Sequence, residues 1–410
     1  MQILVLLVLT VQQKNKIWSI SLVSFCWSTA SMMATSVLPI YLTEKLNIGY
    51  AKIGYLEGMA VFCAFAAKVF AGILSDWLQK RHILIVLGSI LSVITKPMLA
   101  LSTTYNMIFI ARFIDRFAKG IRSAPTDALI ADLNPERLNY AFGFRQAIYI
   151  LGAVFGALLS ILIMSLIGPE YQIIFYTALI PASIAVVVLL IFVKDPVFPK
   201  HNKFNYKQSF ININDFKNFS VYYWSVLFIT FFLMIARFSE SFLSLNVKQF
   251  GWPVHWLPLI IIISDLSHSY FAFISRKFAT QAAAERLLIL GLMILIIANI
   301  TWALADSNLT IIISIVLTGM HMGITQGVLR TLVAMSSSNV NVNGTAFALF
   351  YLVSGCGVFI GNSIAGVLAE TFWLSAVFIG GMIASSIALI LLLGLRLYRN
   401  KFYGLAVEEE

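Results

Sequence analysis

Twelve apolar stretches, each about as long as a membrane-spanning helix, divide this chain of 410 residues. They lie at 17–42, 51–74, 83–101, 105–121, 141–166, 173–193, 221–247, 255–274, 287–304, 309–334, 345–369 and 372–397. Crossing the hydrocarbon core of a bilayer takes about 20 apolar residues in a helix, because every backbone polar group must be satisfied inside the segment. With 60% hydrophobic and 11% charged residues, the chain has too little charge for a water-soluble enzyme. We therefore predict an all-α integral membrane protein with twelve transmembrane helices.

The longest polar segment, 194–220, separates the sixth apolar stretch from the seventh and is rich in lysine and asparagine. It predicts a connection between two halves of six helices each. The predicted organisation is an N-terminal six-helix bundle at 1–194, a cytoplasmic linker at 195–220, and a C-terminal six-helix bundle with a short cytoplasmic tail at 221–410.

The basic residues predict the orientation of the helices. Of the 28 Lys and Arg residues, 20 lie in or beside connections on one side, while only Lys45, Lys52 and Lys248 lie on the other. Cytoplasmic loops carry the excess of Lys and Arg, so both termini are predicted to be cytoplasmic. This topology accounts for the net charge of +10, and we expect no nucleic-acid partner.

The sequence lacks the motifs of several enzyme classes. No G-x-x-x-x-G-K-[ST] loop occurs that would hold ATP phosphates. Cys26, Cys63 and Cys356 are far apart and predict neither a disulfide framework nor a metal site. No nucleophile and base pair or cofactor motif is present. We therefore expect no enzyme activity, no cofactor and no metal, and any active transport must use a gradient.

The two halves share a pattern of glycines. Gly152 and Gly156 in the fifth stretch recur as Gly357 and Gly361 in the eleventh, a shift of 205 residues. Similarly, Gly120 precedes a Leu-Ile-Ala segment by nine residues, and Gly323 precedes Leu-Val-Ala by nine. Two parallel repeats of six helices are one architecture of membrane transporters, and GxxxG pairs allow close helix approach.

Two motifs carry a family resemblance. Residues 72–81 read GILSDWLQKR and resemble the loop G-x-x-x-D-R-x-G-R-R of the major facilitator superfamily, although positions 77 and 79 depart from it. Residues 115–132 read DRFAKGIRSAPTDALIAD and resemble the D-R-x-G-K-G-x-R-x-x-P-R-D-A-L-I-A-D stretch of a bacterial branch, except at positions 118 and 126. The resemblance implies that Gly72, Asp76, Lys80 and Arg81 form a gating loop.

The resemblance also implies two six-helix bundles that rock about a central site, as in alternating access. The expected function is secondary active transport of a small solute across the bacterial inner (plasma) membrane, with protons as the usual coupling ion. The expected partners are a small-molecule substrate, protons and the lipid bilayer, and the expected state is a monomer. The fold alone does not identify a substrate.

Ionisable side chains inside predicted spans are costly in lipid, so each is a functional hypothesis. Glu57 and Lys68 are eleven residues apart, which places them about 20° apart on one helix face and about 16 Å apart along the axis. This face is predicted to line a cavity, with Glu57 as a proton or substrate-amine site and Lys68 as its charge partner. The alternative for Lys68 is that it snorkels towards the cytoplasmic surface.

Arg112, Asp115 and Arg116 follow an i, i+3, i+4 pattern, which predicts an internally paired ladder on one helix face. We expect Arg112 to reach the cavity, and Asp115 and Arg116 to form gate contacts. Direct substrate contacts and a solvated helix end are the alternatives.

Two further sets lie in the second half. Arg237 and Glu240 are three residues apart, which favours either a structural ion pair or a switchable substrate or proton pair. Arg330 is predicted to contact lipid headgroups or to clamp an anionic substrate. His268 and His321 are either proton-relay groups or hydrogen-bonded packing residues.

The signs of these charges leave the substrate open. Lys68, Arg112, Arg237 and Arg330 favour an organic anion or a metal chelate, which is the slightly preferred interpretation. The acidic residues, among them Glu57 and Glu240, favour proton-driven efflux of cationic or amphiphilic compounds. A non-transporting membrane receptor or assembly factor on the same fold is the alternative of another class.

Overall fold

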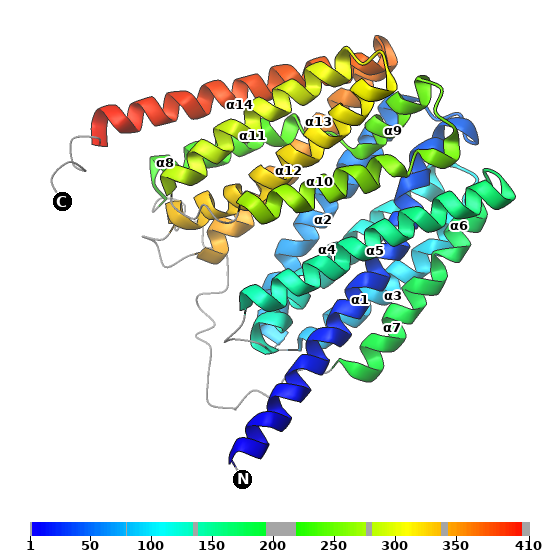
Figure 1. The fold of residues 1–410 in the computed structure, drawn as a ribbon, viewed down its shortest axis with the longest axis vertical. Helices are drawn as coiled ribbons and strands as arrows, with labels where there is room; N and C mark the ends of the chain where they lie inside the picture. Colours follow the sequence, from blue (N-terminus) through cyan, green and yellow to red (C-terminus); the bar gives the residue numbers. More distant parts are fainter. Residues whose placement is uncertain are drawn as a thin grey trace. The chain divides into compact units, whose positions relative to one another are not determined.

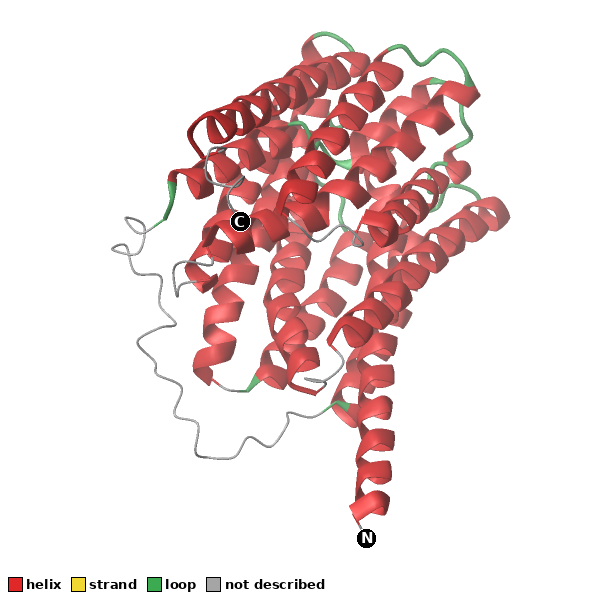
Figure 2. Ribbon diagram, turned by 60° about the vertical axis from the view of Figure 1, so that its left-hand side comes forward, coloured by secondary structure: helices red, strands yellow, loops and turns green. Residues whose placement is uncertain are grey.

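The computed structural model describes residues 2–403 apart from 79, 134–137, 194–218, 276–280 and 338–342 (Figures 1 and 2). Within these residues, helices joined by short loops are the regular secondary structure. In chain order the helices are α1 Gln2–Glu44, α2 Tyr50–Leu78, α3 Arg81–Ala100, α4 Tyr105–Leu133, α5 Leu138–Ile167, α6 Tyr171–Thr177, α7 Leu179–Phe192, α8 Val221–Ile235, α9 Glu240–Gln249, the 3₁₀ helix η4 Val254–Trp256, α10 Leu259–Ser275, α11 Gln281–Ala303, α12 Asn308–Ser337, α13 Asn343–Thr371 and α14 Leu374–Tyr403. Apart from residues 219 and 220, the predicted linker at 195–220 lies outside the described residues, so a division of the chain there stays a prediction.

Within these ranges, eleven segments are long and apolar enough to cross a membrane. Three of them combine two elements each: Tyr171–Phe192, Val221–Gln249 and Val254–Ser275. α4, with 29 residues, is the twelfth long segment, and its charged residues keep it out of the composition-based count. The exposed faces are apolar, as in α7, where Ile184, Val187 and Ile191 are 46%, 53% and 58% exposed. The predicted all-α membrane class is confirmed.

The seventh span is broken, although a continuous helix at 221–247 was predicted. α8 ends at Ile235 and α9 begins at Glu240. Non-helical backbone is tolerated at membrane depth only where protein satisfies its polar groups. Here the backbone N–H of Arg237 donates to the carbonyl of Met234 at 3.3 Å, and that of Ser239 donates to Oδ1 of Asn362 at 2.7 Å. The break is therefore a stabilised feature of the helix.

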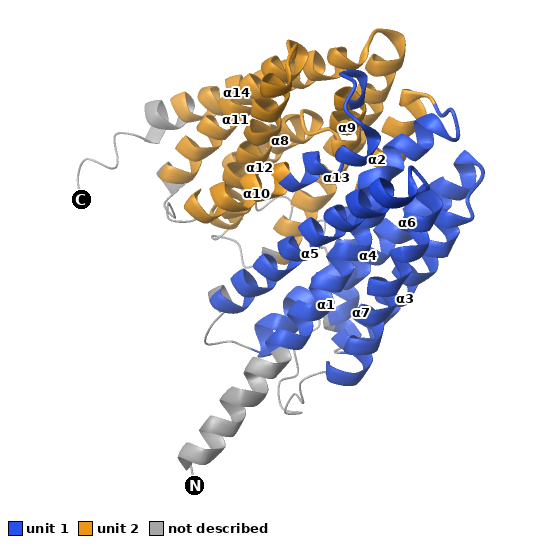
Figure 3. Cartoon of the chain, turned by 45° about the vertical axis from the view of Figure 1, so that its right-hand side comes forward, with its two compact units in different colours: residues 1–48, 63–209, 248–262 blue, residues 49–62, 210–247, 263–410 orange. Residues whose placement is uncertain are grey.

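The described residues form two compact units (Figure 3). Unit 1 comprises Met1–Ile48, Cys63–Ser209 and Lys248–Ile262, and unit 2 comprises Gly49–Phe62, Phe210–Val247 and Ile263–Glu410. The helix α2 is shared, since its first part packs with unit 2 and the part from Cys63 onwards packs with unit 1. The units are thus not simply the first and second halves of the chain.

Glycines let helix backbones approach closely within each unit. In unit 1, a Cβ at Gly156 would lie 2.4 Å from the carbonyl oxygen of Thr29 on α1. In unit 2, a Cβ at the repeat-related Gly361 would lie 2.3 Å from the carbonyl oxygen of Ile235 on α8. The predicted role of these glycines in close helix approach is confirmed, and the two repeats use it on corresponding helices.

Gly361→Ala should therefore lower the free energy of unfolding by about 1–3 kcal/mol, the usual cost of overpacking a tight contact. Gly327→Ala is the matched control on a neighbouring helix, because nothing lies within 4 Å of a Cβ placed there. Thermal unfolding of the detergent-purified protein measures both. Equal unfolding temperatures for the two variants would contradict the close contact.

Candidate functional site

The most densely charged helix of the structure, α4, holds a buried carboxylate. Asp115 lies ten residues after the start of α4 at Tyr105 and is 4% exposed, while Arg112, on the same face, is 3% exposed. α4 continues to Leu133, well beyond the predicted end of this span at residue 121. The face therefore lies inside unit 1, and the alternative of a solvated helix end is wrong.

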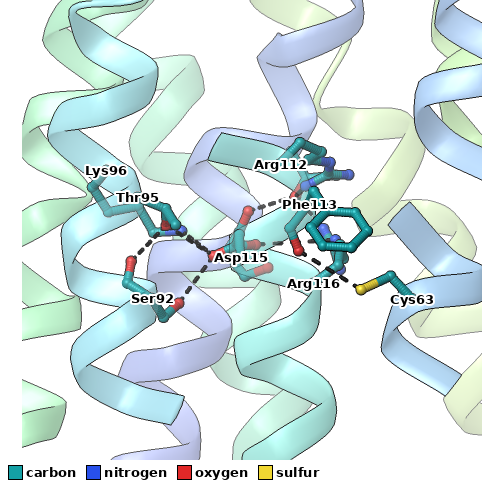
Figure 4. Close-up of polar contacts among 10 residues, drawn as sticks. Cys63, Ser92, Thr95, Lys96, Arg112, Phe113, Asp115 and Arg116 are labelled. Carbon is teal, nitrogen blue, oxygen red and sulfur yellow. Dashed lines mark hydrogen bonds and ion pairs between the residues drawn. The ribbon is translucent and has the colours of Figure 1, made fainter. Parts of the chain in front are cut away.

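Three side chains of α3 meet Asp115 at one oxygen (Figure 4). Ser92 donates to Oδ1 of Asp115 at 2.9 Å, Thr95 at 3.2 Å and the ammonium of Lys96 at 2.8 Å. These three residues have the same i, i+3, i+4 spacing on α3 as the charged residues on α4, so the two faces match along the packed helices. The side chains of Lys96 and Asp115 are 1% and 6% exposed, which makes this a fully buried ion pair.

Two guanidinium groups of α4 converge on α1. Nη1 of Arg112 and Nη2 of Arg116 each lie 3.1 Å from the hydroxyl of Thr35, which itself donates to the carbonyl of Ser31 at 2.8 Å. Nε of Arg116 lies 4.0 Å from Oδ2 of Asp115. We call Thr35, Lys96, Arg112, Asp115 and Arg116 the α4 cluster. Its ionisable members are three cations and one carboxylate.

Burial sets the energetics of this cluster. Taking a charge out of water costs several kcal/mol per ion, and a buried pair recovers this only with good geometry and further hydrogen bonds. Oδ1 of Asp115 meets that condition, because it accepts hydrogen bonds from Ser92, Thr95 and Lys96. Loss of Asp115 would leave the ammonium of Lys96 inside unit 1 without its carboxylate, and loss of Lys96 would leave Asp115 only its longer pair with Arg116.

The structure brings Lys68 to a partner that was not predicted. Its ammonium lies 3.6 Å from Oδ2 of Asp127, and Nη2 of Arg145 lies 2.7 Å from the other oxygen of the same carboxylate. Lys68 is therefore an ion-pair partner of Asp127 in unit 1. The cavity-lining face predicted for Glu57 and Lys68, and the snorkelling alternative for Lys68, stay predictions.

The residues of the predicted gating loop differ in their surroundings. Arg81 forms an ion pair with Asp132, with 2.5 Å between Nη1 and Oδ2. A Cβ placed on Gly72 would lie 3.7 Å from Cβ of Ala124 on α4, an ordinary contact, and Lys80 is exposed just before α3. The side chain of Asp76 lies outside the described part of the structure, so its gating role stays a prediction.

Two other predicted site residues lie in unit 2. Glu57 is 3% exposed in the first part of α2, next to Gly58, where a Cβ would lie 2.8 Å from the carbonyl oxygen of Phe359 on α13. Arg330 is exposed on α12, and its Nε donates to the carbonyl of Gln326 at 3.3 Å. The predicted headgroup contact and the predicted anion clamp of Arg330 both stay predictions.

Arg237 stands in the break of the seventh span and turns to α12. Its Nε donates to Nε2 of His321 at 3.1 Å, and its Nη2 donates to the hydroxyl of Thr325. The predicted ion pair with Glu240 is wrong, because α8 ends before Arg237 and α9 begins only at Glu240, so helical spacing does not apply between them. His321 is 0% exposed and hydrogen-bonded, which matches the predicted packing alternative in this conformation.

Some residues of these sites were not singled out from the sequence. Thr35, Ser92, Thr95 and Lys96 were not among the predicted site residues. The signal that identifies them is the i, i+3, i+4 spacing of Ser92, Thr95 and Lys96, which becomes meaningful once α3 is known to pack along α4. Among the described side chains, no group of three or more His, Cys, Asp or Glu is placed to hold a metal ion.

Two comparisons with known sequences match this chain to the same family. The family model described as Major Facilitator Superfamily matches residues 20–333. An uncharacterized MFS-type transporter of Methanocaldococcus jannaschii is 28% identical over 362 residues, which cover 86% of this chain and 88% of the relative.

Solved structures resemble the whole fold. A mutant form of the nucleoside transporter NupG superposes with a TM-score of 0.80 at 16% identity, covering 92% of this chain and 99% of NupG. The human organic anion transporter MFSD10 superposes with a TM-score of 0.68 at 14% identity, covering 93% and 99%. At such identities these structures show a common fold and do not indicate a common substrate.

A double-mutant cycle tests the buried pair. Lys96→Met should lower the free energy of unfolding by about 3–5 kcal/mol, because it leaves a buried carboxylate without its ammonium. Adding Asp115→Leu should recover part of that loss, because it removes the carboxylate that had lost its ammonium, while Arg116 loses its longer pair with Asp115. Unfolding of the purified single and double variants provides the measurement. Strictly additive losses would show that the two side chains do not stabilise each other.

Proposed function

The chain belongs to the Major Facilitator Superfamily and is a secondary transporter, and from this premise we propose that its substrate is a small anionic solute. An organic acid or an anionic metal chelate is the preferred class. The proposal includes coupling to protons, a monomeric state, location in a bacterial inner membrane and cytoplasmic termini. The distribution of Lys and Arg among the connections supports the orientation.

One observation carries the anionic substrate: the α4 cluster holds three cations and one carboxylate. Asp115 pairs with Lys96 at 2.8 Å and with Arg116 at 4.0 Å, so the cluster contains two more cations than carboxylates. Both reach the same hydroxyl of Thr35, which holds the two planar groups close together. A guanidinium presents its N–H groups as a fork that matches carboxylate and phosphate oxygens, so two neighbouring ones suit an anion.

A second candidate, efflux of cationic compounds in exchange for protons, is favoured by Glu57. This carboxylate is 3% exposed within a span, and an ionisable residue at such a place is a functional hypothesis in its own right. A carboxylate that binds a proton in one step and a cation in the next is the minimum that an exchanger of this kind requires. The two candidates therefore predict opposite ligand charges.

Ligand binding to the purified protein distinguishes them. The panel consists of mono-, di- and tricarboxylates, phosphate esters, ferric chelates and lipophilic cations, with thermal unfolding as the readout, because a ligand of the folded state raises its apparent stability. We expect an anion to stabilise the wild type and the shift to be lost in Arg112→Ala. Arg286→Ala, which removes an exposed guanidinium on α11, is the matched control and should keep the shift.

The competing candidate predicts the converse result. Stabilisation by a lipophilic cation that is abolished in Glu57→Gln and retained in Arg112→Ala would overturn the anionic substrate. If an anion raises the unfolding temperature of Arg112→Ala as much as that of the wild type, the anion does not bind at the α4 cluster. The proposal would then lose its support.

A further inference from the structure

A small pocket lies beside the break of the seventh span, entirely within unit 2. Residues 236–238 of the break, α9, α11 and α12 line it. Most of the lining is apolar, and the polar side chains in it come from Arg237, Asn299, Thr318 and His321. Its free space is about large enough for one water molecule, so the pocket is too small for an organic substrate.

Two polar groups at the pocket, the side-chain amide of Asn299 and the guanidinium of Arg237, carry hydrogen-bond donors. Asn299 is 2% exposed, and its Nδ2 has no hydrogen-bond partner within the described part of the chain. Nε2 of His321 accepts from Arg237, so the hydrogen of this ring sits on Nδ1 and is donated to the carbonyl of Gly291 at 2.7 Å. Both nitrogens of His321 are thus engaged, and His321 offers no free acceptor to the pocket.

The charge of Arg237 is not balanced by its own hydrogen bonds. The two acceptors described for it are a neutral imidazole and the hydroxyl of Thr325. It follows the C-terminus of α8, whose dipole supplies the equivalent of only about half a negative charge. Arg237 is partly buried, and a charge held partly out of water without an opposite charge nearby is costly. A buried N–H group without an acceptor, as in Asn299, adds to that cost.

The internal repeat shows what the pocket lacks. Gly88 and Gly120 on α3 and α4 correspond to Gly291 and Gly323 on α11 and α12, in each case with a shift of 203 residues. The same shift takes Lys96 to Asn299 and Asp115 to Thr318. Where unit 1 has a carboxylate beside a cation, unit 2 has a hydroxyl beside Arg237, together with a small free volume. The pocket therefore lies where the repeat relation predicts a negative charge in unit 2.

We propose that this pocket binds a chloride ion, held by the side-chain amide of Asn299 and the guanidinium of Arg237. Chloride is close to water in size, accepts hydrogen bonds without having to donate any, and supplies the charge that Arg237 requires. A water molecule there would leave the charge of Arg237 unbalanced. The site is separate from the α4 cluster and independent of the nature of the transported solute.

Chloride titration of the detergent-purified full chain tests the site without any transport. The protein is held at constant ionic strength while sodium gluconate is replaced by sodium chloride, and thermal unfolding is followed. The wild type should gain stability along a saturable curve. In Asn299→Leu the half-saturating concentration should rise about tenfold or more, because a hydrogen bond to an ion is lost. Arg237→Gln should abolish the chloride effect.

Two further variants sharpen the result. Asn246→Leu is the matched control, because Asn246 is 1% exposed and its Nδ2 also has no partner among described residues, yet it does not line the pocket. It should keep the wild-type chloride curve. Thr318→Asp supplies the carboxylate that the repeat-related Asp115 provides in unit 1, so it should remove the chloride dependence and keep the protein stable in gluconate.

The opposite outcomes overturn the proposal. Identical unfolding temperatures of the wild type in chloride and gluconate would mean that the pocket holds water or nothing. A chloride curve that is unchanged in both Asn299→Leu and Thr318→Asp would place the chloride effect elsewhere in the protein. If Asn299→Leu does not fold, the comparison of Thr318→Asp with Asn246→Leu decides alone.

Discussion

Lipid offers no water to solvate a charge or a backbone amide, and this constraint governs where every polar group of the protein is found. Backbone groups are satisfied within helices, and the break in the seventh span, between Ile235 and Glu240, is satisfied by Met234 and by the side chain of Asn362. Charges obey the same requirement. Asp115 is accommodated within unit 1 because three donors of α3 meet its Oδ1 at 2.8–3.2 Å.

The two units satisfy the requirement in different ways. In unit 1 the positions at the centre of the α3 and α4 pair are a cation and a carboxylate, Lys96 and Asp115, which neutralise each other. In unit 2 the corresponding positions are the uncharged Asn299 and Thr318, and the cation, Arg237, comes instead from the broken span. Where unit 1 has a buried ion pair, unit 2 thus has a pocket with a positive charge at its edge.

The fold could be read from the sequence to a large extent because hydrophobic length is a local property. The twelve apolar stretches and the glycines that allow close helix packing were predicted from residues that are near one another in the chain. The break at 236–239 was not, since it contains neither glycine nor proline and its stability depends on Asn362, more than a hundred residues away. The wrong pairing of Arg237 with Glu240 followed directly from that missed break.

The site was less predictable for a related physical reason. The sequence identified the charged face of α4, but its counter-charge comes from another helix, and Lys68 likewise finds Asp127, which is 59 residues further along the chain. Spacing within one helix reveals which side chains share a face. It does not reveal which helix packs against that face, and in this protein the partner helix determines whether a charge is balanced.

Uptake into proteoliposomes tests the central claim most directly. Purified protein is reconstituted, and the initial uptake of a radiolabelled organic anion that stabilises the protein is compared with uptake into protein-free liposomes. The account predicts saturable uptake of the anion that depends on the protein and is competed by unlabelled anion. Saturable movement of lipophilic cations, with no protein-dependent movement of any anion, would contradict it.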